Sequence, residues 1–214
     1  MSRIRVPALL IALCVMFASA PAFAQSFEKL LWAAGKGDVP TVSALLSQGL
    51  DPNSADQDGY TLLMLAARQG HDELVAFLLN HKASVNRRSP HGDTALMGAA
   101  LKGHLTTVKL LVANGAELNP KGWTPLHYAA FEGRPEVIKY LLDQRADKNG
   151  LAPNGYTALM LATRQGHVAA ARELLFADAD FHVRGPKGET ALAIARERLQ
   201  KEVEALLLRA GAVE

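Results

Sequence analysis

The pattern of apolar positions repeats along the chain with a fixed period. Five threonines, Thr61, Thr94, Thr124, Thr157 and Thr190, are separated by 33, 30, 33 and 33 residues. Each has a glycine two positions before it, a leucine two positions after it, and a pair of large aliphatic residues about half a period further on. Self-similarity at such a period is typical of repeat architectures, so we expect a stack of equivalent structural units.

One repeat, residues 122–154, shows which elements the pattern predicts. Thr124 is a good N-cap, and Pro125 suits the first position of a helix, where its missing N–H leaves no bond unmade. Gly133 is expected to end this short helix. A second helix follows, with its apolar residues on one face: Val137, Ile138, Leu141 and Leu142. Each unit is therefore predicted to be two helices followed by a polar loop.

The same register extends toward the N-terminus. Ala33, Leu45 and Gly49 fall where it predicts, and Glu28 takes the place of the threonine. Neither helix of a unit can bury its apolar face alone, so we predict that the units stack around one continuous core, with the first and last as caps. The expected units are about residues 26–58, 59–91, 92–121, 122–154, 155–187 and 188–214.

Two motifs indicate a family that the chain resembles. Gly-Trp-Thr-Pro-Leu-His-Tyr-Ala-Ala at residues 122–130 and Gly-Ala-Glu-Leu-Asn at residues 115–119 resemble the ankyrin signature. The resemblance extends over residues 26–214. It implies an all-α ankyrin-repeat solenoid of six helix-turn-helix units, with projecting β-hairpin loops and a concave face.

Several positions depart from the repeat pattern. The glycine expected after the second helix is replaced by Lys82, Arg145 and Asp178. If these positions need a left-handed backbone, each replacement is strained by about 1 kcal/mol. The position of His127 is methionine in three other units, and we expect these side chains in the core: Met64, Met97 and Met160.

The N-terminal segment is typical of a secretory signal peptide. Arg3 and Arg5 supply a positive start, residues 6–17 are apolar, and Ala24 precedes the predicted cleavage site before Gln25. An uncleaved membrane anchor is an alternative, although the apolar run is shorter than the ~20 residues that a span needs. A lipoprotein signal at Cys14 is a second alternative, disfavoured by the bulky Leu13 before it.

Removal of residues 1–24 would leave a mature ankyrin-repeat domain of residues 25–214. The whole chain has 23 Lys+Arg and 21 Asp+Glu, and two arginines leave with the signal, so the mature chain has 21 of each. A neutral chain without a basic block gives no support for nucleic acid or anionic lipid as a partner. The single cysteine also leaves, so no disulfide is expected. We expect a monomer without a membrane span, located in the periplasm or, alternatively, outside the cell.

Candidate chemistry along the chain is sparse. His71, His104 and His167 occupy the same repeat position, so they should lie about one repeat apart and not converge on one ion. The mature chain has no cysteine ligand and no His-x-x-x-His pair. It also lacks a Gly-x-Ser-x-Gly elbow and a Gly-rich phosphate loop. We therefore predict no metal, no cofactor and no enzymatic activity.

The resemblance implies a binding face. In ankyrin repeats the residue before the threonine and the two after the Ala-Ala pair point to the concave side. The predicted partner-binding residues at these positions are Trp123, Phe131, Tyr60, Tyr156, Arg68, Gln69, Leu101, Lys102, Glu132 and Arg164. Aromatic and arginine side chains on a rigid scaffold are typical of protein-binding hot spots.

Other interpretations of these aromatic residues stay open. The rings can instead pack on the next hairpin, and for Tyr60 and Tyr156 we favour that interpretation. The loop between Asn119 and Gly122 is three residues shorter than its equivalents, so we expect a stunted hairpin that widens access to Trp123.

The function that these observations favour is recognition of a protein partner. The partner is unidentified, and the chain would shield, inhibit or organise it. An envelope enzyme and a toxin are the candidate partners. The alternative is a small-molecule or metal-binding periplasmic protein, which would need a convergent polar pocket or a histidine cluster.

Overall fold

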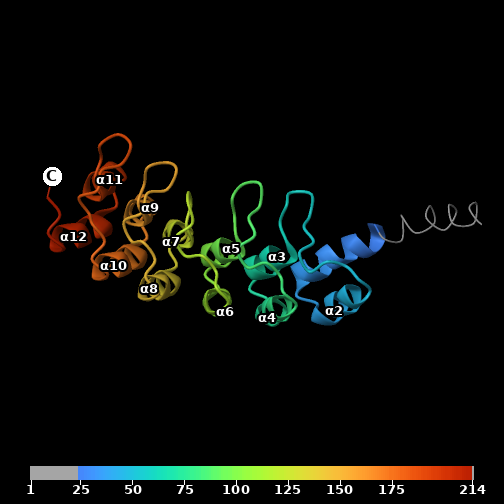
Figure 1. The fold of residues 1–214 in the computed structure, drawn as a ribbon. Coiled ribbons are helices and arrows are strands. Elements are labelled where there is room, and N and C mark those ends of the chain that lie inside the picture. The colour runs from blue at the N-terminus through green and yellow to red at the C-terminus, as the bar shows by residue number, and fades with distance from the viewer. Residues whose placement is uncertain (1–23, 214) are drawn as a thin grey trace, which may run out of the picture.

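The structure, a computed structural model, describes residues 24–213, and these residues fold into short helices joined by turns and loops (Figure 1). A first helix occupies residues 24–36. The helices that follow are α2 (Val39–Ser47), α3 (Leu62–Gln69), α4 (Asp72–Asn80), α5 (Ala95–Lys102), α6 (Leu105–Ala113), α7 (Pro125–Phe131), α8 (Pro135–Asp143), α9 (Ala158–Gln165), α10 (Val168–Phe176), α11 (Ala191–Glu197) and α12 (Lys201–Arg209).

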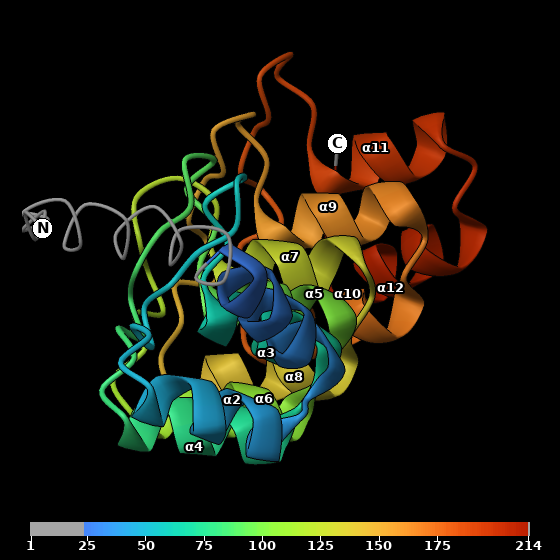
Figure 2. The same cartoon turned by 90° about the vertical axis from the view of Figure 1, so that its right-hand side faces the viewer.

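The helices form two rows along a solenoid. Helices α3, α5, α7, α9 and α11 pack on one another in sequence to form the first row, and α4, α6, α8, α10 and α12 form the second. Each first-row helix also packs on the helix that follows it in the chain. Viewed along the stack, the last pair is rotated relative to the early ones, so the solenoid twists (Figure 2). The predicted all-α solenoid is confirmed.

Threonine hydroxyls cap the N-termini of the first-row helices. In α3 the hydroxyl oxygen of Thr61 accepts a 3.2 Å bond from the amide of Met64, and Thr124 accepts one of 3.3 Å from the amide of His127. Thr94, Thr157 and Thr190 cap α5, α9 and α11 in the same way. These bonds satisfy amides that have no partner inside the helix, which explains the period of the threonines.

Apolar side chains of both rows make one continuous core. The leucine two positions after each threonine is almost fully buried. In the second row, each helix contributes a fully buried leucine: Leu78, Leu111, Leu141, Leu174 and Leu207. Met64, Met97 and Met160 are also buried, which confirms their predicted place. His127 occupies the same position in α7, where its Nε2 lies 2.9 Å from the carbonyl oxygen of Gly150.

The long loops project from the first-row side of the solenoid (Figure 1). Four of them end in a tight turn that two backbone hydrogen bonds close. In the first, the amide of Asp56 donates to the carbonyl of Tyr60, and the amide of Gly59 donates to the carbonyl of Asp56. No β-strand forms in residues 24–213, where one isolated antiparallel bridge joins Ala55 and Thr61. The predicted β-hairpins are therefore not confirmed, because these bonds close a turn without extending into a ladder.

The loop before α7 differs from the others. It connects Ala113 to Pro125, whereas the loop before α5 connects Asn80 to Ala95 and is three residues longer. Among the described backbone hydrogen bonds, none closes the tight turn within residues 114–124. The loop beside Trp123 is accordingly short, as the sequence predicts.

Asparagines link each loop to the next one. The side-chain oxygen of Asn53 accepts a 2.7 Å bond from the amide of Ser84, and Asn86 accepts one of 2.8 Å from the amide of Glu117. The same bond joins Asn119 to Asp147 and Asn149 to Asp180, each at 2.8 Å. Because each bond crosses one repeat, the loops are held in register along the stack.

Three replacements of glycine after second-row helices lie in the left-handed region. The backbone φ is 63° at Lys82, 68° at Arg145 and 57° at Asp178, so the condition for strain at these positions is met. Leu199, in the turn between α11 and α12, has the same backbone with a φ of 57°. A side chain at such a φ is disfavoured, so each of the four positions stores some strain.

The predicted signal peptide lies almost wholly outside the described residues, which begin at residue 24. Within residues 24–213, none of the helices has both the length and the apolar character that a bilayer crossing requires.

Candidate functional site

The ten residues predicted to bind a partner lie at the two ends of α3, α5, α7 and α9, and we call this surface the first-helix ribbon. Phe131 is 40% exposed. The other exposed members are Arg68, Gln69, Lys102 and Arg164. The half-buried members are Tyr60, Leu101, Trp123, Glu132 and Tyr156.

Two tyrosines of the ribbon are bonded to the next repeat. The Tyr60 hydroxyl donates a 3.0 Å bond to Oδ2 of Asp93, and the Tyr156 hydroxyl donates a 2.8 Å bond to Oε1 of Glu189. These bonds are the main reason that the pKa of both phenols is raised above the usual value. The Arg164 guanidinium lies 5.7 Å from the centre of the Tyr156 ring, a cation–π distance. The favoured interpretation, in which these two rings contact the neighbouring repeat, agrees with this geometry.

Asp93 accepts a hydrogen bond from a second tyrosine, which the sequence analysis did not predict. The Tyr128 hydroxyl donates a 2.7 Å bond to Oδ1 of Asp93, from the repeat that follows it. Burial, followed by this hydrogen bond, raises the pKa of the Tyr128 phenol. Asp93 thus joins three consecutive repeats through Tyr60 and Tyr128, and the phenols stay protonated beside a carboxylate.

Trp123 has a different environment from the two tyrosines. Its ring lies 5.7 Å from the Tyr128 ring, centre to centre, and 6.0 Å from the His127 ring. Among the described hydrogen bonds, none involves its indole N–H. The side chain is half-buried, so it combines a fixed ring with an N–H that is available to an acceptor.

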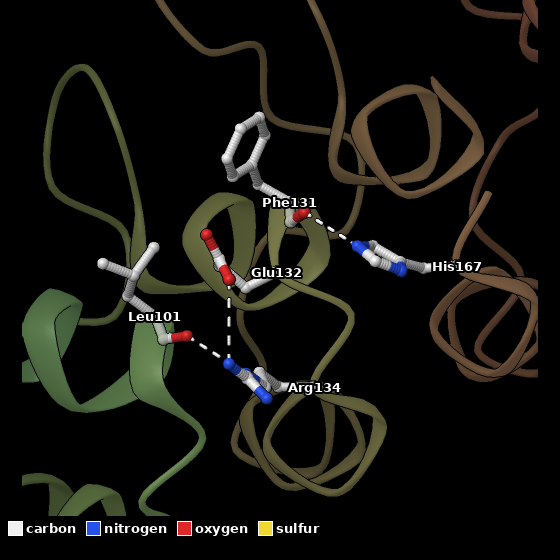
Figure 3. A network of polar contacts seen from close by, with 5 residues as sticks. All are labelled: Leu101, Phe131, Glu132, Arg134 and His167. Atoms are coloured by element: carbon white, nitrogen blue, oxygen red, sulfur yellow. Dashed lines mark hydrogen bonds and ion pairs between the residues drawn. The ribbon is translucent and has the colours of Figure 1, made fainter. Parts of the chain in front are cut away.

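Phe131 is held by its backbone, while its side chain is partly exposed. Figure 3 shows the ring pointing away from His167, whose Nε2 lies 3.0 Å from the Phe131 carbonyl oxygen. In the same network Nε of Arg134 donates a 3.1 Å bond to the Leu101 carbonyl, and its guanidinium lies 3.7 Å from a Glu132 carboxylate oxygen. The ends of α5 and α7 are therefore fixed by side chains from the following repeat.

The recurring histidines belong to this system of links between repeats. Nε2 of His71 lies 3.0 Å from the carbonyl oxygen of Gly35, just as His167 lies beside Phe131. Arg134 takes the histidine's place in the fourth repeat. The link needs a small neighbour, because a side chain at Gly133 would meet the His167 ring at 2.5 Å. Among residues 24–213, no group of three metal-ligating side chains lies close enough to hold an ion.

A small cavity opens in the ribbon between α3 and α7. Its volume is about 130 Å³, and it is lined by Tyr60, Arg68, Asp93, Gly98 and Tyr128 over a floor of apolar side chains. Gly98 stands where other repeats have leucine, isoleucine or tyrosine, such as Leu161 and Tyr128. The missing side chain in α5 leaves the space open. The break in the repeat pattern at this position was the one signal in the sequence that could have revealed the cavity.

A larger cavity lies between α10 and α12, on the second row. Its volume is about 490 Å³, and its walls include Phe176, Phe181 and Leu206. Phe176 is 75% exposed. None of the ten predicted binding residues lines this cavity.

Comparison with known families agrees with the geometry of stacked helix pairs and projecting loops. A family model described as "Ankyrin repeats (3 copies)" matches residues 30–121, 87–151 and 117–185. Its three overlapping matches together span residues 30–185, which is most of the chain. The chain belongs to the ankyrin-repeat family. Ankyrin repeats generally mediate protein–protein interaction, and the family is typically non-catalytic. No curated protein matches the chain.

Proposed function

We propose that this ankyrin-repeat protein binds a protein partner through the first-helix ribbon, with Trp123 and Phe131 as its anchors. The observation that carries the proposal is that these two aromatic side chains are available for contact with a partner. Tyr60 and Tyr156 use their hydroxyls within the stack, whereas the Trp123 indole N–H has no hydrogen bond among the described residues. The Phe131 side chain is 40% exposed. Large aromatic side chains that are fixed and available are the usual anchors of protein interfaces.

The scaffold beneath these anchors favours binding because it is already ordered. The carbonyl of Phe131 is linked to His167, and the Trp123 ring rests against Tyr128. A partner would therefore immobilise few additional groups, which reduces the entropic penalty of association. We propose that the short loop before α7 widens access to Trp123.

The proposed setting is the bacterial periplasm. A positively charged start, an apolar run and small residues before Gln25 support export. In that compartment the chain would shield or inhibit an envelope enzyme or a toxin without catalysing a reaction itself. The absence of cysteine after residue 24 suits a domain whose stability comes from packing alone.

Affinity capture from the envelope fraction tests this proposal. The full chain, expressed with its own N-terminus and a C-terminal tag, serves as bait beside a Trp123→Ala/Phe131→Ala variant. Phe176→Ala is the matched control, since it removes an exposed ring from the second row. We expect one protein to be retained by the wild type and by the control and lost from the double variant. Equal retention by all three would place the binding surface elsewhere.

A further inference from the structure

The cavity beside Gly98 has the size of one side chain and a charged wall. Its volume of about 130 Å³ is too small for a drug-sized ligand, which typically needs several hundred Å³. Met97 and Leu101 contribute apolar surface, and Tyr60 and Tyr128 contribute aromatic surface. The chemistry of the wall therefore decides which side chain fits.

Asp93 is the fixed negative charge of this wall. Each carboxylate oxygen accepts one tyrosine hydroxyl, from Tyr60 at 3.0 Å and from Tyr128 at 2.7 Å. A carboxylate oxygen has two lone pairs, so each oxygen retains capacity for a further donor. The two hydrogen bonds from the phenols hold the carboxylate in one orientation. The result is a preorganised anion in a cavity that two aromatic side chains also line, which is an environment that attracts a cation.

We propose that this cavity is a subsite for one cationic side chain, an arginine or a lysine, of the partner protein. The proposal rests on the proposed function and specifies the chemistry of the partner. The guanidinium or ammonium group would donate to Asp93 and lie against the rings of Tyr60 and Tyr128, with its alkyl stem over Met97 and Leu101. An arginine or lysine stem covers apolar surface in this way while its head remains polar.

Arg68 also lines the cavity and sets a limit on affinity. Its side chain is exposed, and among the salt bridges between described residues none joins it to Asp93. An exposed charge is screened by water and salt, so its repulsion of an incoming cation is modest. Arg68→Gln should consequently strengthen the binding of a cation, by about twofold.

A titration with a single amino-acid derivative tests the subsite directly. The full chain is titrated with Nα-acetyl-arginine methylamide while the backbone amide signals of Gly98 and Leu101 are followed by NMR spectroscopy. The neutral isostere Nα-acetyl-citrulline methylamide is the control ligand. We expect saturable shifts in the millimolar range with the arginine derivative, and affinity weaker by about tenfold with the citrulline derivative, since it lacks the charge-assisted bond.

Two variants and a matched control distinguish loss of the subsite from loss of the fold. Gly98→Leu fills the cavity, and an added Cβ would meet its nearest neighbour, Cβ of Arg68, at an ordinary 3.4 Å. It also replaces a glycine inside a helix, so its melting temperature should rise while probe binding disappears. Asp93→Asn should weaken binding about tenfold. Glu189→Gln, at the equivalent Tyr156 pair, should leave the Gly98 shifts unchanged.

The subsite and the proposed function fail in different ways. Each of three results would overturn the subsite. They are the lack of a saturable shift at Gly98 with the arginine derivative, equal binding of the citrulline derivative, and retained binding in Gly98→Leu. A captured partner that depends on Trp123 and Phe131 but binds Gly98→Leu equally well would also overturn it, and the proposed function would stand. A partner lost from both the Trp123/Phe131 variant and Gly98→Leu supports both.

Discussion

Tyr128 and Asp93 lie 35 positions apart in the chain, and the hydroxyl of Tyr128 donates a 2.7 Å hydrogen bond to the carboxylate of Asp93. Tyr60 donates to the other oxygen of the same carboxylate. The loop before α5 is thereby bonded to the repeats on both sides of it. This arrangement fixes the ribbon where Trp123, packed against Tyr128, presents its indole N–H.

Removal of the Tyr128 hydroxyl should change how stability depends on alkaline pH. Burial and the bond to Asp93 raise the pKa of this phenol in the folded state above its usual value of about 10. The stabilisation is therefore fully present below about pH 10 and is lost as the pH rises toward the folded-state pKa. Tyr128→Phe should lose about 1–2 kcal/mol at neutral pH and show a shallower alkaline decline. Urea unfolding across the alkaline range measures both, and an unchanged pH profile would contradict the assignment.

Acid should destabilise the fourth repeat through His127. Burial is the main cause of the lowered pKa of this histidine. In addition, Nδ1 accepts a 3.2 Å bond from the amide of Thr124, and protonation of Nδ1 would break that bond. A folded-state pKa below the unfolded value of about 6.5 means that stability falls as the pH falls through this range. His127→Met copies the other repeats and should unfold with a weaker pH dependence between about pH 7 and about pH 5. Equal dependence in both proteins would refute this role.

Glycine at the left-handed positions should stabilise the fold. Lys82→Gly, Arg145→Gly and Leu199→Gly each relieve a side chain held at a positive φ, and each should raise the free energy of unfolding by about 1 kcal/mol. Thermal unfolding followed by circular dichroism measures the effect. Gly133→Ala is the opposite control, since its added methyl group would collide with the His167 ring, and its melting temperature should fall. Lower melting temperatures in all three glycine variants would show that the positions are not strained.

A buried hydroxyl in α9 should be better replaced by a methyl group. Thr163 is fully buried, and its oxygen is the one buried side-chain polar atom without a hydrogen bond among residues 24–213. Thr163→Val keeps the volume and removes the unsatisfied oxygen, so the protein should gain about 1 kcal/mol. The matched control is Thr107→Val, because the equally buried Thr107 hydroxyl donates to Asp72. Chemical denaturation of the two variants should give shifts of opposite sign, and a loss of stability in both would contradict this reading of Thr163.

The repeat period was sufficient to predict the helices, their threonine caps and the buried methionines. These features depend on interactions within a few residues or on one apolar face, so spacing along the chain determines them. The left-handed backbone at Arg145 could also be predicted, because a glycine occupies that position in other repeats. The matching family model bears out the resemblance carried by residues 122–130.

The contact of Tyr60 and Tyr156 with the next repeat was expected, but the hydrogen-bond partners between repeats could not be predicted from the sequence. The bonds that Asp93 receives from Tyr60 and Tyr128 depend on how far one repeat is displaced and rotated on the next. The cavity at Gly98 arises because two neighbouring repeats leave a space that a side chain fills elsewhere. Arg134 was not recognised as the equivalent of His71 and His167, since an arginine and a histidine share a geometric role here without chemical similarity. The β-hairpins were expected from the resemblance, and only the turns of those loops form.

Site-specific photo-crosslinking in living cells tests the central claim, protein binding by the first-helix ribbon, most directly. A photoreactive phenylalanine derivative replaces Phe131 in one strain and Phe176 in a second, and both rings are exposed in the folded protein. Adducts are separated by mass after irradiation and identified by mass spectrometry. We predict a discrete adduct with one envelope protein from position 131 and none from position 176. An adduct from position 176 alone, or none from either position, would contradict binding through the ribbon.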